Sequence, residues 1–442
     1  MAKPESLRWM IAGLLFLSTG LNYLDRQTLS ILATTIQEDL KIDDMGYARI
    51  TSYFLISYTI MYAVSGRLVD FLGTRRSLAL AVSGWSLAGM LHGVAHSAGQ
   101  LAACRLLLGT FESANFPAGI KAVAEWFPVK MRALGIGIFA AGGSFGAAVA
   151  APLVSYLALA YGWRLAFVVV GALGFAWMAA WLAIYQPAAR HPRLTAAERA
   201  EFEQETHASG GTVTFGFWAL LANRRTWGCI LVRVFTDPIV YFVSFWIPKY
   251  LTTAHGFSLA DIGKYAWIPF VALSGGNILG GSIASWLVGR GGGVDRVRKG
   301  LMLTASLLVL GSGALVATAT NPFVALLGIT GISLGHGLWG NLAVPAEVFP
   351  SHSVAFVTGL AGTLGGVAGI LSQFGIAWAA GQQGYGIIFA VFSVCPLLAY
   401  LAVKILVGRL GEISFDLAPR LEHKNHGRSE EHTSELQSLT NL

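Results

Sequence analysis

Apolar runs long enough to cross a membrane recur along nearly the whole chain, and they constrain its fold more than any other feature. About twenty apolar residues span the hydrocarbon core of a bilayer as a helix. Only 12% of the residues are charged, whereas about 25% are charged in a typical soluble domain. The sequence therefore predicts an all-α polytopic membrane protein with twelve spans, at about 9–35, 46–70, 76–96, 99–122, 133–158, 163–185, 226–252, 261–289, 300–319, 322–346, 353–381 and 384–408.

The longest polar stretch separates the sixth span from the seventh and divides the chain into two similar parts. We expect an N-terminal six-helix half at 1–185, a cytoplasmic central loop at 186–225, a C-terminal six-helix half at 226–410 and a cytoplasmic tail at 411–442. The closing segment RSEEHTSELQSLTNL (428–442) is similar to a translated sequencing adapter. We interpret residues 423–442 as non-native and leave them out of the functional reasoning.

Lysine and arginine gather in every second connection between the predicted spans, and the remaining connections are poor in both. By the positive-inside rule, this pattern places both termini and the central loop in the cytoplasm. We expect a multi-pass protein of the cell membrane, specifically a bacterial inner membrane. The net charge of +7 does not indicate a nucleic-acid partner, because the basic residues lie between apolar runs and not along one helix face. The basic residues that set the orientation include Arg67, Arg132, Arg190, Arg193, Arg224, Arg225, Arg290, Arg296, Arg298 and Lys299.

The connection after the second span carries the most specific motif, GRLVDFLGTRR (66–76). Gly66 is expected to permit close helix packing, Asp70 lies at the cytoplasmic end of the span, and Gly73 turns the chain before Arg75 and Arg76. The spacing G-x-L-x-D-x-x-G-x-R-R resembles the signature loop of the major facilitator superfamily. That resemblance implies two pseudo-symmetric six-helix halves and makes these five residues a conformational loop. The corresponding loop after the eighth span has Ser285 where an acidic residue is expected.

Two further motifs narrow the resemblance within that superfamily. LNYLDRQTLS (21–30) and RLLLGTFESANFPAG (105–119) are similar to the anion:cation symporter family, and FTDPIVYFVSFWIPKYL (235–251) and GWRLAF (162–167) resemble its hexuronate transporters. The resemblance covers residues 1 to about 415 and implies proton-coupled import of a sugar acid such as glucuronate or galacturonate. An aldonate such as galactonate, another small organic anion, and sodium coupling remain open alternatives.

Charged residues inside the first and fourth spans are the strongest candidates for function. A charge at the centre of a spanning helix costs at least about 2.5–3.5 kcal/mol, so such residues usually face a cavity and mark a transport pathway. The guanidinium of Arg26 matches a carboxylate bidentately, which predicts a substrate-binding role. The carboxyl groups of Asp25 and Glu112 titrate, and we predict that they carry the coupled proton.

A structural interpretation of the same residues is the main alternative to the transport role. Asp25, Arg26, Arg105 and Glu112 can form a fixed ionic clamp between the first and fourth spans. Arg105 and Glu112 are two helical turns apart, about 10.5 Å along one face, so we expect them to line one cavity without pairing directly. Arg105 is therefore assigned either to coupling or to a structural ion pair.

The C-terminal half offers fewer charged candidates. Arg233 and Asp237 are spaced i,i+4 and can pair on one helix face, either as a structural pair or as part of the anion site. Pro238 favours a helix break beside them. His336 is more typical of a packed, hydrogen-bonded histidine than of a proton carrier. The remaining residues predicted to contact substrate are Tyr23, Tyr58, Ser144, Asn341 and Gln373; carry-over by position from galactonate-type members supports the two tyrosines.

Other classes of protein leave these features unexplained. GGSFG and GISLGHG place serine, glycine and histidine together, as in an intramembrane serine hydrolase, but that function gives the charges of the first and fourth spans no role. A transporter-like nutrient sensor usually adds a long signalling tail. The sequence contains no metal cluster, P-loop or dinucleotide motif. We therefore predict a monomeric transporter in the lipid bilayer, not an enzyme, which moves a small organic anion with a proton and uses no cofactor or metal.

Overall fold

The computed structural model describes residues 4–128, 131–195, 199, 217–349, 351–382 and 384–411. Most of the predicted central loop and nearly all of the predicted tail, including residues 423–442, lie outside the described residues. The described part of the chain is helical throughout, with no strand. Its N-terminal half consists of α1 (Pro4–Ile31), α2 (Ala33–Leu40), α3 (Asp44–Leu72), α4 (Thr74–His92), α5 (Ala98–Glu112), α6 (Asn115–Trp126), α7 (Arg132–Tyr161) and α8 (Trp163–Ile184), followed by a 3-10 turn, η2 (Ala188–Arg190).

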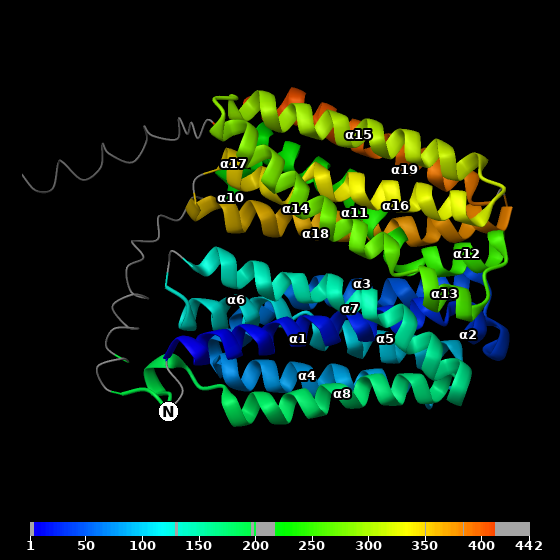
Figure 1. Ribbon diagram of the computed structural model, residues 1–442, viewed down its shortest axis with the longest axis horizontal. Helices are drawn as coiled ribbons and strands as arrows, with labels where there is room; N and C mark the ends of the chain where they lie inside the picture. Colours follow the sequence, from blue (N-terminus) through cyan, green and yellow to red (C-terminus); the bar gives the residue numbers. More distant parts are fainter. Residues whose placement is uncertain are drawn as a thin grey trace, which may run out of the picture.

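The C-terminal half repeats this arrangement as a second bundle beside the first (Figure 1). Its elements are α10 (Phe217–Ala222), α11 (Arg224–Phe245), α12 (Ile247–His255), α13 (Leu259–Tyr265), α14 (Ile268–Gly289), α15 (Val294–Thr318), α16 (Pro322–Trp339), η3 (Asn341–Ala343), α17 (Val344–Val348), α18 (Ser351–Gln382), α19 (Gly386–Ala402) and η4 (Val403–Val407). The long helices of both bundles run in roughly the same direction across the molecule. This architecture confirms the predicted all-α fold of two six-helix halves.

Eight helical segments in the described residues are long and apolar enough to cross a membrane, or nine if α3 is counted as one bent span. They include all six spans of the C-terminal half, together with α7 and α8. The segments that fail this test, α1, α4 and α5 with α6, all belong to the N-terminal half. Taken singly, α5 with 15 residues and α6 with 12 are too short. Polar and charged side chains, among them Asp25, Arg26 and Glu112, also interrupt the apolar sequence of the first and fourth spans.

Several predicted spans are divided into shorter helices in the structure, and the divisions of the seventh and fourth spans bear on the candidate residues. The predicted break at Pro238 is wrong, because α11 continues through this proline to Phe245. The chain breaks instead at Trp246, and Pro248 lies in the first turn of α12. Proline has no N–H to donate. It is therefore best tolerated in the first turn of a helix, where an N–H would have no intrahelical partner. The predicted fourth span also divides in two, because α5 ends at Glu112 and α6 begins at Asn115.

Glycines of α7 allow α1 to pack directly against the α7 backbone. A Cβ atom on Gly142 would lie 2.0 Å from the carbonyl oxygen of Phe16, and one on Gly146 would lie 2.0 Å from that of Gly20. Such spacing of small residues lets membrane helices approach closely. The stretch GGSFGAAVAAP (142–152) therefore contributes a close-packing face of α7. Gly66 behaves differently, since no described atom lies within 4 Å of the position of its absent Cβ; close packing is the wrong explanation for that glycine in this conformation.

The two halves contact each other at one end of the molecule, which we call the α2 end because α2, α12 and α13 lie there (Figure 1). Gly263 of α13 packs against Ser155 of α7, where an added Cβ would lie 2.8 Å from the serine Cβ. Between described residues, the hydrogen bonds and ion pairs that join the halves also lie at this end. We call the opposite end, where α6, α10 and α17 lie, the α6 end.

Candidate substrate-binding site

Arg26 and Glu112 form a buried ion pair within the N-terminal half. Arg26 lies in the last part of α1, and Glu112 is the final residue of α5. The Nη2 and Nε atoms of Arg26 donate to Glu112 Oε2 at 2.8 and 3.2 Å. Nη2 also donates to Asn22 Oδ1, one turn earlier, at 3.3 Å. Within the described residues, Arg26 Nη1 has no hydrogen-bond acceptor, and Glu112 Oε1 is buried without a partner.

Three aromatic rings surround the guanidinium of Arg26. Its Cζ atom lies 4.7 Å from the ring centre of Tyr23, 4.9 Å from that of Phe54 and 5.0 Å from that of Tyr58. The faces of aromatic rings attract cations, and the attraction strengthens where water is excluded. Phe54 is buried, whereas the two tyrosines are only half-buried. The three rings therefore stabilise the guanidinium, and the side chains of Tyr23 and Tyr58 remain partly exposed.

Asp25 and Arg105 are close to this pair but do not join it. Asp25 points toward α4, where its Oδ1 atom would lie 2.9 Å from a Cβ atom on Gly89. Its Oδ2 atom has no hydrogen-bond partner among the described residues. Arg105 donates from Nη2 to the backbone carbonyl of Arg26 at 3.5 Å. The structure thus shows a two-residue ion pair between α1 and α5, with no ion pair from Asp25 or Arg105 among the described residues.

A second polar group belongs to the C-terminal half. Arg233 Nε lies 2.7 Å from Asp237 Oδ1 in the i,i+4 pair expected from the sequence. Asp237 packs against α18, since its Oδ2 atom would lie 2.3 Å from a Cβ atom on Gly365. Asn341 Nδ2 donates to Thr236 Oγ1 at 2.8 Å. The buried His336 interacts electrostatically with Arg233, and its Nδ1 atom has no partner among the described residues.

The polar groups of the two halves face each other. Phe54 of α3, which packs on Arg26, meets Phe245 of α11 across the halves, with ring centroids 6.2 Å apart. The ring of Tyr241, also on α11, stacks parallel to that of Phe245 at 6.3 Å. The candidate residues of the first, second and seventh predicted spans therefore border one region between the halves, which we call the central site.

Gln373 and Ser144 are also predicted to contact substrate, but they do not belong to the polar groups around Arg26 and Arg233. Gln373 Oε1 accepts hydrogen bonds from Thr51 Oγ1 at 3.1 Å and from Trp246 Nε1 at 2.8 Å. This amide therefore joins the halves at the α2 end. Ser144 is half-buried on α7. It follows Gly143, whose Cβ position would lie 2.8 Å from the Tyr23 ring, so the serine is adjacent to the wall of the central site.

The signature loop forms a network at the α6 end. Lys121 Nζ lies 2.7 Å from Asp70 Oδ1, and Gly73 adopts a φ of +78°, a value that favours glycine. Arg75 donates to the carbonyl of Leu182, and Arg76 is exposed. The corresponding loop of the C-terminal half has an exposed Ser285 and uses a different ion pair, Arg298 Nε to Glu347 Oε1 at 2.5 Å.

Sequence reasoning missed several residues of these networks. Lys121 of α6 pairs with Asp70, and Glu125, one turn later, accepts a hydrogen bond from Thr74 at 2.7 Å. Their i,i+4 spacing at the end of an apolar span was the available signal. Phe54, which packs on Arg26, carries no such signal, because one more phenylalanine in an apolar span is ordinary.

Two six-helix halves that enclose a buried arginine and make contact at one end are the arrangement expected of a membrane transporter. The family model for the Major Facilitator Superfamily matches residues 15–373. The chain belongs to this superfamily, which confirms the resemblance drawn from the signature loop.

Curated relatives extend over most of the chain. A hexuronate transporter of Escherichia coli strain K12 is 34% identical over 414 residues, which cover 91% of this chain and 94% of the relative. A galacturonate transporter of Dickeya chrysanthemi is 35% identical and covers 74% of this chain and 95% of its own. A D-galactonate transporter of Escherichia coli O6:H1 is 28% identical, with 93% and 96% covered.

Solved structures share the fold at low sequence identity. A D-xylose-proton symporter has a TM-score of 0.73 at 16% identity, with 92% of this chain and 99% of that chain covered. A bacterial homologue of the human lysosomal transporter Spinster has a TM-score of 0.70 at 18% identity, with 92% and 96% covered.

Proposed function

We propose that the chain is a proton-coupled symporter that imports a sugar acid, specifically a hexuronate such as glucuronate or galacturonate, by alternating access. The relatives named as hexuronate and galacturonate transporters support the substrate class. The observation that carries the proposal is Arg26, a buried cation held by Glu112 and three aromatic rings at the interface of the halves.

Arg26 binds the carboxylate of the substrate. Its Nη1 atom makes no hydrogen bond to the described residues, and its Nη2 and Nε atoms are held only by Glu112 and Asn22. A carboxylate that approaches from the open side of the tyrosines gains charge-assisted hydrogen bonds from this fork. Tyr23 and Tyr58 then contact the sugar ring and its hydroxyl groups. Ser144 of α7 is a further contact to the substrate.

Protonation of Glu112 links the proton to the substrate. A substrate carboxylate competes with Glu112 for the same guanidinium, and two carboxylates next to each other disfavour double ionisation. Proton uptake at Glu112 removes this competition and frees the arginine for the substrate. Asp25 is a second candidate for the coupled proton, because its Oδ2 atom is buried and has no hydrogen-bond partner among the described residues. Arg105 supports both carboxyl groups electrostatically.

The C-terminal half completes the site as the carrier closes. The polar partners for the distal hydroxyl groups of the substrate are then Arg233, Asp237 and Asn341. Gln373 is released for the substrate only when the contacts at the α2 end open. The two halves rotate as rigid units around this central site, and the signature-loop residues Gly66, Asp70, Gly73, Arg75 and Arg76 adjust the α6 end.

The orientation follows from the distribution of basic residues. Both termini and the α6 end face the cytoplasm of a bacterial cell, and the α2 end faces outward. Because the polar contacts between the halves lie at the α2 end in this conformation, we propose that it is the state in which the central site opens toward the cytoplasm. The carrier acts as a monomer, because each chain contains both halves and one complete site.

Uptake of radiolabelled sugar acids into proteoliposomes tests this function directly. A hexuronate is expected to accumulate under an inward proton gradient and not under a sodium gradient of the same size. Relatives named as galactonate transporters make an aldonate the second candidate. Preferential accumulation of galactonate would show that the substrate is an aldonate and not a hexuronate. Accumulation driven only by sodium would show that sodium is the coupling ion.

A further inference from the structure

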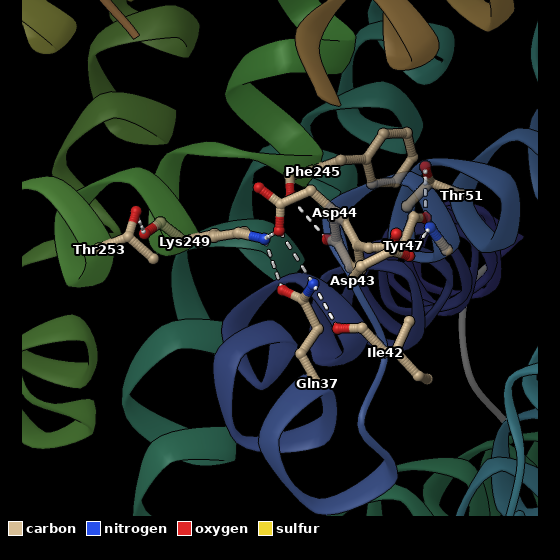
Figure 2. Close-up of polar contacts among 10 residues, drawn as sticks. Gln37, Ile42, Asp43, Asp44, Tyr47, Thr51, Phe245, Lys249 and Thr253 are labelled. Carbon is tan, nitrogen blue, oxygen red and sulfur yellow. Dashed lines mark hydrogen bonds and ion pairs between the residues drawn. The ribbon is translucent and has the colours of Figure 1, made fainter. Parts of the chain in front are cut away.

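Lys249 joins the two halves through an ion pair at the α2 end. It belongs to α12, and its Nζ atom pairs with the carboxylate of Asp44, the first residue of α3 (Figure 2). Of the ion pairs between described residues, this one alone links the N-terminal half to the C-terminal half. The lysine side chain is 4% exposed, whereas that of Asp44 is 33% exposed.

Gln37 of α2 connects both charged groups. Its Oε1 atom accepts a hydrogen bond from Lys249 Nζ at 2.6 Å, and its Nε2 atom donates to Asp44 Oδ1 at 3.1 Å. Nε2 also donates to the carbonyl of Ile42 at 3.1 Å, which fixes the amide orientation. The side chains of Gln37, Asp44 and Lys249 thus close a ring of three contacts across the halves (Figure 2).

The break between α11 and α12 positions the lysine for this pairing. Trp246 interrupts the helix, and the ammonium of Lys249 lies 5.5 Å from the Trp246 ring and 5.6 Å from the Tyr47 ring. At the same break, Tyr47 donates its hydroxyl proton to the carbonyl of Phe245 at 2.6 Å. These contacts exclude water from the inner side of the ion pair.

A cavity of about 550 Å³ reaches the ion pair from the outer side. Its lining includes Glu38, Asp44, Lys249, Thr253 and Tyr385. Both halves contribute to this wall, so the cavity follows the boundary between them and ends at the ring of Gln37, Asp44 and Lys249. Separation of the halves along this boundary breaks the contacts of Lys249 with Gln37 and Asp44.

We infer that Gln37, Asp44 and Lys249 form a latch that holds the α2 end closed and sets the balance between the two access states of the carrier. The inference rests on the alternating access of the proposed function. Opening at the α2 end requires Lys249 to leave Asp44, so the energy of this pair is present in one state and absent in the other. Only such a differential interaction can shift a conformational equilibrium.

The labelling rate of a buried cysteine measures how readily the α2 end opens in the absence of substrate. Ser30 is a suitable reporter position, because it lies one turn beyond Arg26 on α1 and is 1% exposed. A membrane-impermeant maleimide added to the outside of intact cells reaches Ser30→Cys only when the α2 end opens. Adding Lys249→Met is expected to raise the labelling rate roughly tenfold, the equivalent of about 1.4 kcal/mol in the opening equilibrium. The same protein without the reporter gives the background from Cys104, Cys229 and Cys395.

Charge exchange separates the latch from a general loss of packing. Asp44→Lys alone places two ammonium groups together and is expected to accelerate labelling at least as much as Lys249→Met. The double variant Asp44→Lys with Lys249→Asp restores the attraction and is expected to return the rate toward that of the parent. Labelling that remains fast in the double variant, at equal membrane abundance, would overturn the inference.

A matched ion pair at the same end provides the control. Arg164 Nη1 lies 2.7 Å from Asp39 Oδ2, but both residues belong to the N-terminal half. Hydrogen bonds from Arg164 and Trp163 lower the pKa of Asp39, so this pair is charged at neutral pH. Arg164→Met is expected to leave Ser30→Cys labelling unchanged. An equal increase in labelling rate by Arg164→Met and Lys249→Met would show that the loss of any charge loosens this end. That result would reject the inferred latch.

Different experimental results would reject the latch and the proposed function. An unchanged labelling rate in Lys249→Met, together with proton-driven hexuronate uptake by the parent, would reject the latch and keep the function. Accelerated labelling in a protein that transports no sugar acid would keep the latch and reject the substrate assignment.

Discussion

Burial of an arginine in a spanning helix demands compensation, and Arg26 obtains it from several directions. Glu112 neutralises the charge, Asn22 accepts a hydrogen bond, and aromatic rings cover the guanidinium. Glu112 itself is fully buried and leaves one carboxylate oxygen without a partner in the described structure. An arrangement built only for stability would satisfy both oxygens, because an unsatisfied buried acceptor costs about 1–3 kcal/mol. The open oxygen and the open face of Arg26 therefore favour a functional role.

Replacing Arg26 by lysine tests the requirement for a planar fork. Arg26→Lys keeps the charge but cannot bind a carboxylate with two parallel hydrogen bonds. The loss of one charge-assisted hydrogen bond, about 1.5–3 kcal/mol, predicts a roughly ten- to hundredfold weaker apparent affinity in uptake assays. Near-normal affinity would show that the carboxylate binds elsewhere, with Arg233 as the next candidate.

Glu112→Gln tests proton coupling at the same site. The amide keeps the shape of a protonated carboxyl group but cannot release a proton, so the loaded carrier still reorients without a buried negative charge. We expect substrate–substrate exchange to persist and pH-driven accumulation to disappear, with both measured in the same proteoliposomes. Loss of both activities in correctly inserted protein would favour a purely structural ion pair, and full accumulation would exclude Glu112 from coupling.

Asp25→Asn provides the comparison for Glu112→Gln. Asp25 faces Gly89 of α4, whereas Arg26 pairs with Glu112 of α5. Neutralisation there is expected to abolish pH-driven accumulation while the fork of Arg26 keeps its geometry, so that exchange persists. Accumulation equal to that of the parent would assign the transported proton to Glu112 alone.

Helix packing positions these residues, and α1 lies directly against the backbone of α7. Carbonyl oxygens of α1 occupy the space that side chains at Gly142 and Gly146 would fill. Because α1 carries Tyr23, Asp25 and Arg26, any displacement of α1 from α7 moves the central site.

Gly146→Ala is expected to destabilise the protein because its new methyl group would lie 2.0 Å from the carbonyl oxygen of Gly20. The helices must separate, and overpacking of this kind typically costs about 1–3 kcal/mol. Thermal unfolding in detergent should show a lower midpoint for this variant. Gly137→Ala on the same helix is the matched control, because no described atom lies within 4 Å of its Cβ position; an equal loss in both variants would contradict the packing explanation.

Sequence patterns predicted the elements better than the contacts between them. Apolar length located the spans, and i,i+4 spacing predicted the Arg233–Asp237 pair. The side of α1 that Asp25 faces could not be predicted, because consecutive helical residues point about 100° apart and the neighbour on each side depends on tertiary packing. Lys249 gave no signal either, since a lysine near a span end is ordinary. The partners of Lys249 come from α2 and α3, more than two hundred positions earlier.

At the scale of the whole molecule, the two ends differ in how the halves meet. Polar contacts of α2, α3, α12 and α18 join the halves at the α2 end. Between described residues, the ion pairs at the α6 end stay within one half, as for Asp70 with Lys121 and Arg298 with Glu347. Under the proposed alternating access, this conformation is the state that is closed at the α2 end, and the orientation in the membrane determines which side that end faces.

Surface labelling establishes that orientation. His96 lies after α4 and Arg296 lies at the start of α15, and both are exposed. By the positive-inside rule, His96→Cys is expected to react with an impermeant maleimide in intact cells, and Arg296→Cys only in inverted vesicles. The reverse pattern would make this conformation open to the outside. Denatured samples of both variants show that each cysteine is reactive once accessible.

The ion pair of Arg26 and Glu112 also has an electrical consequence. Its two charges cancel, so the empty central site adds no net charge to the halves that move around it. A monoanion that enters with one proton keeps this balance, and the membrane voltage then does no work on the loaded carrier. Each additional proton would move one elementary charge, worth about 2.3 kcal/mol per 100 mV. The current that accompanies uptake therefore counts the protons carried with each anion.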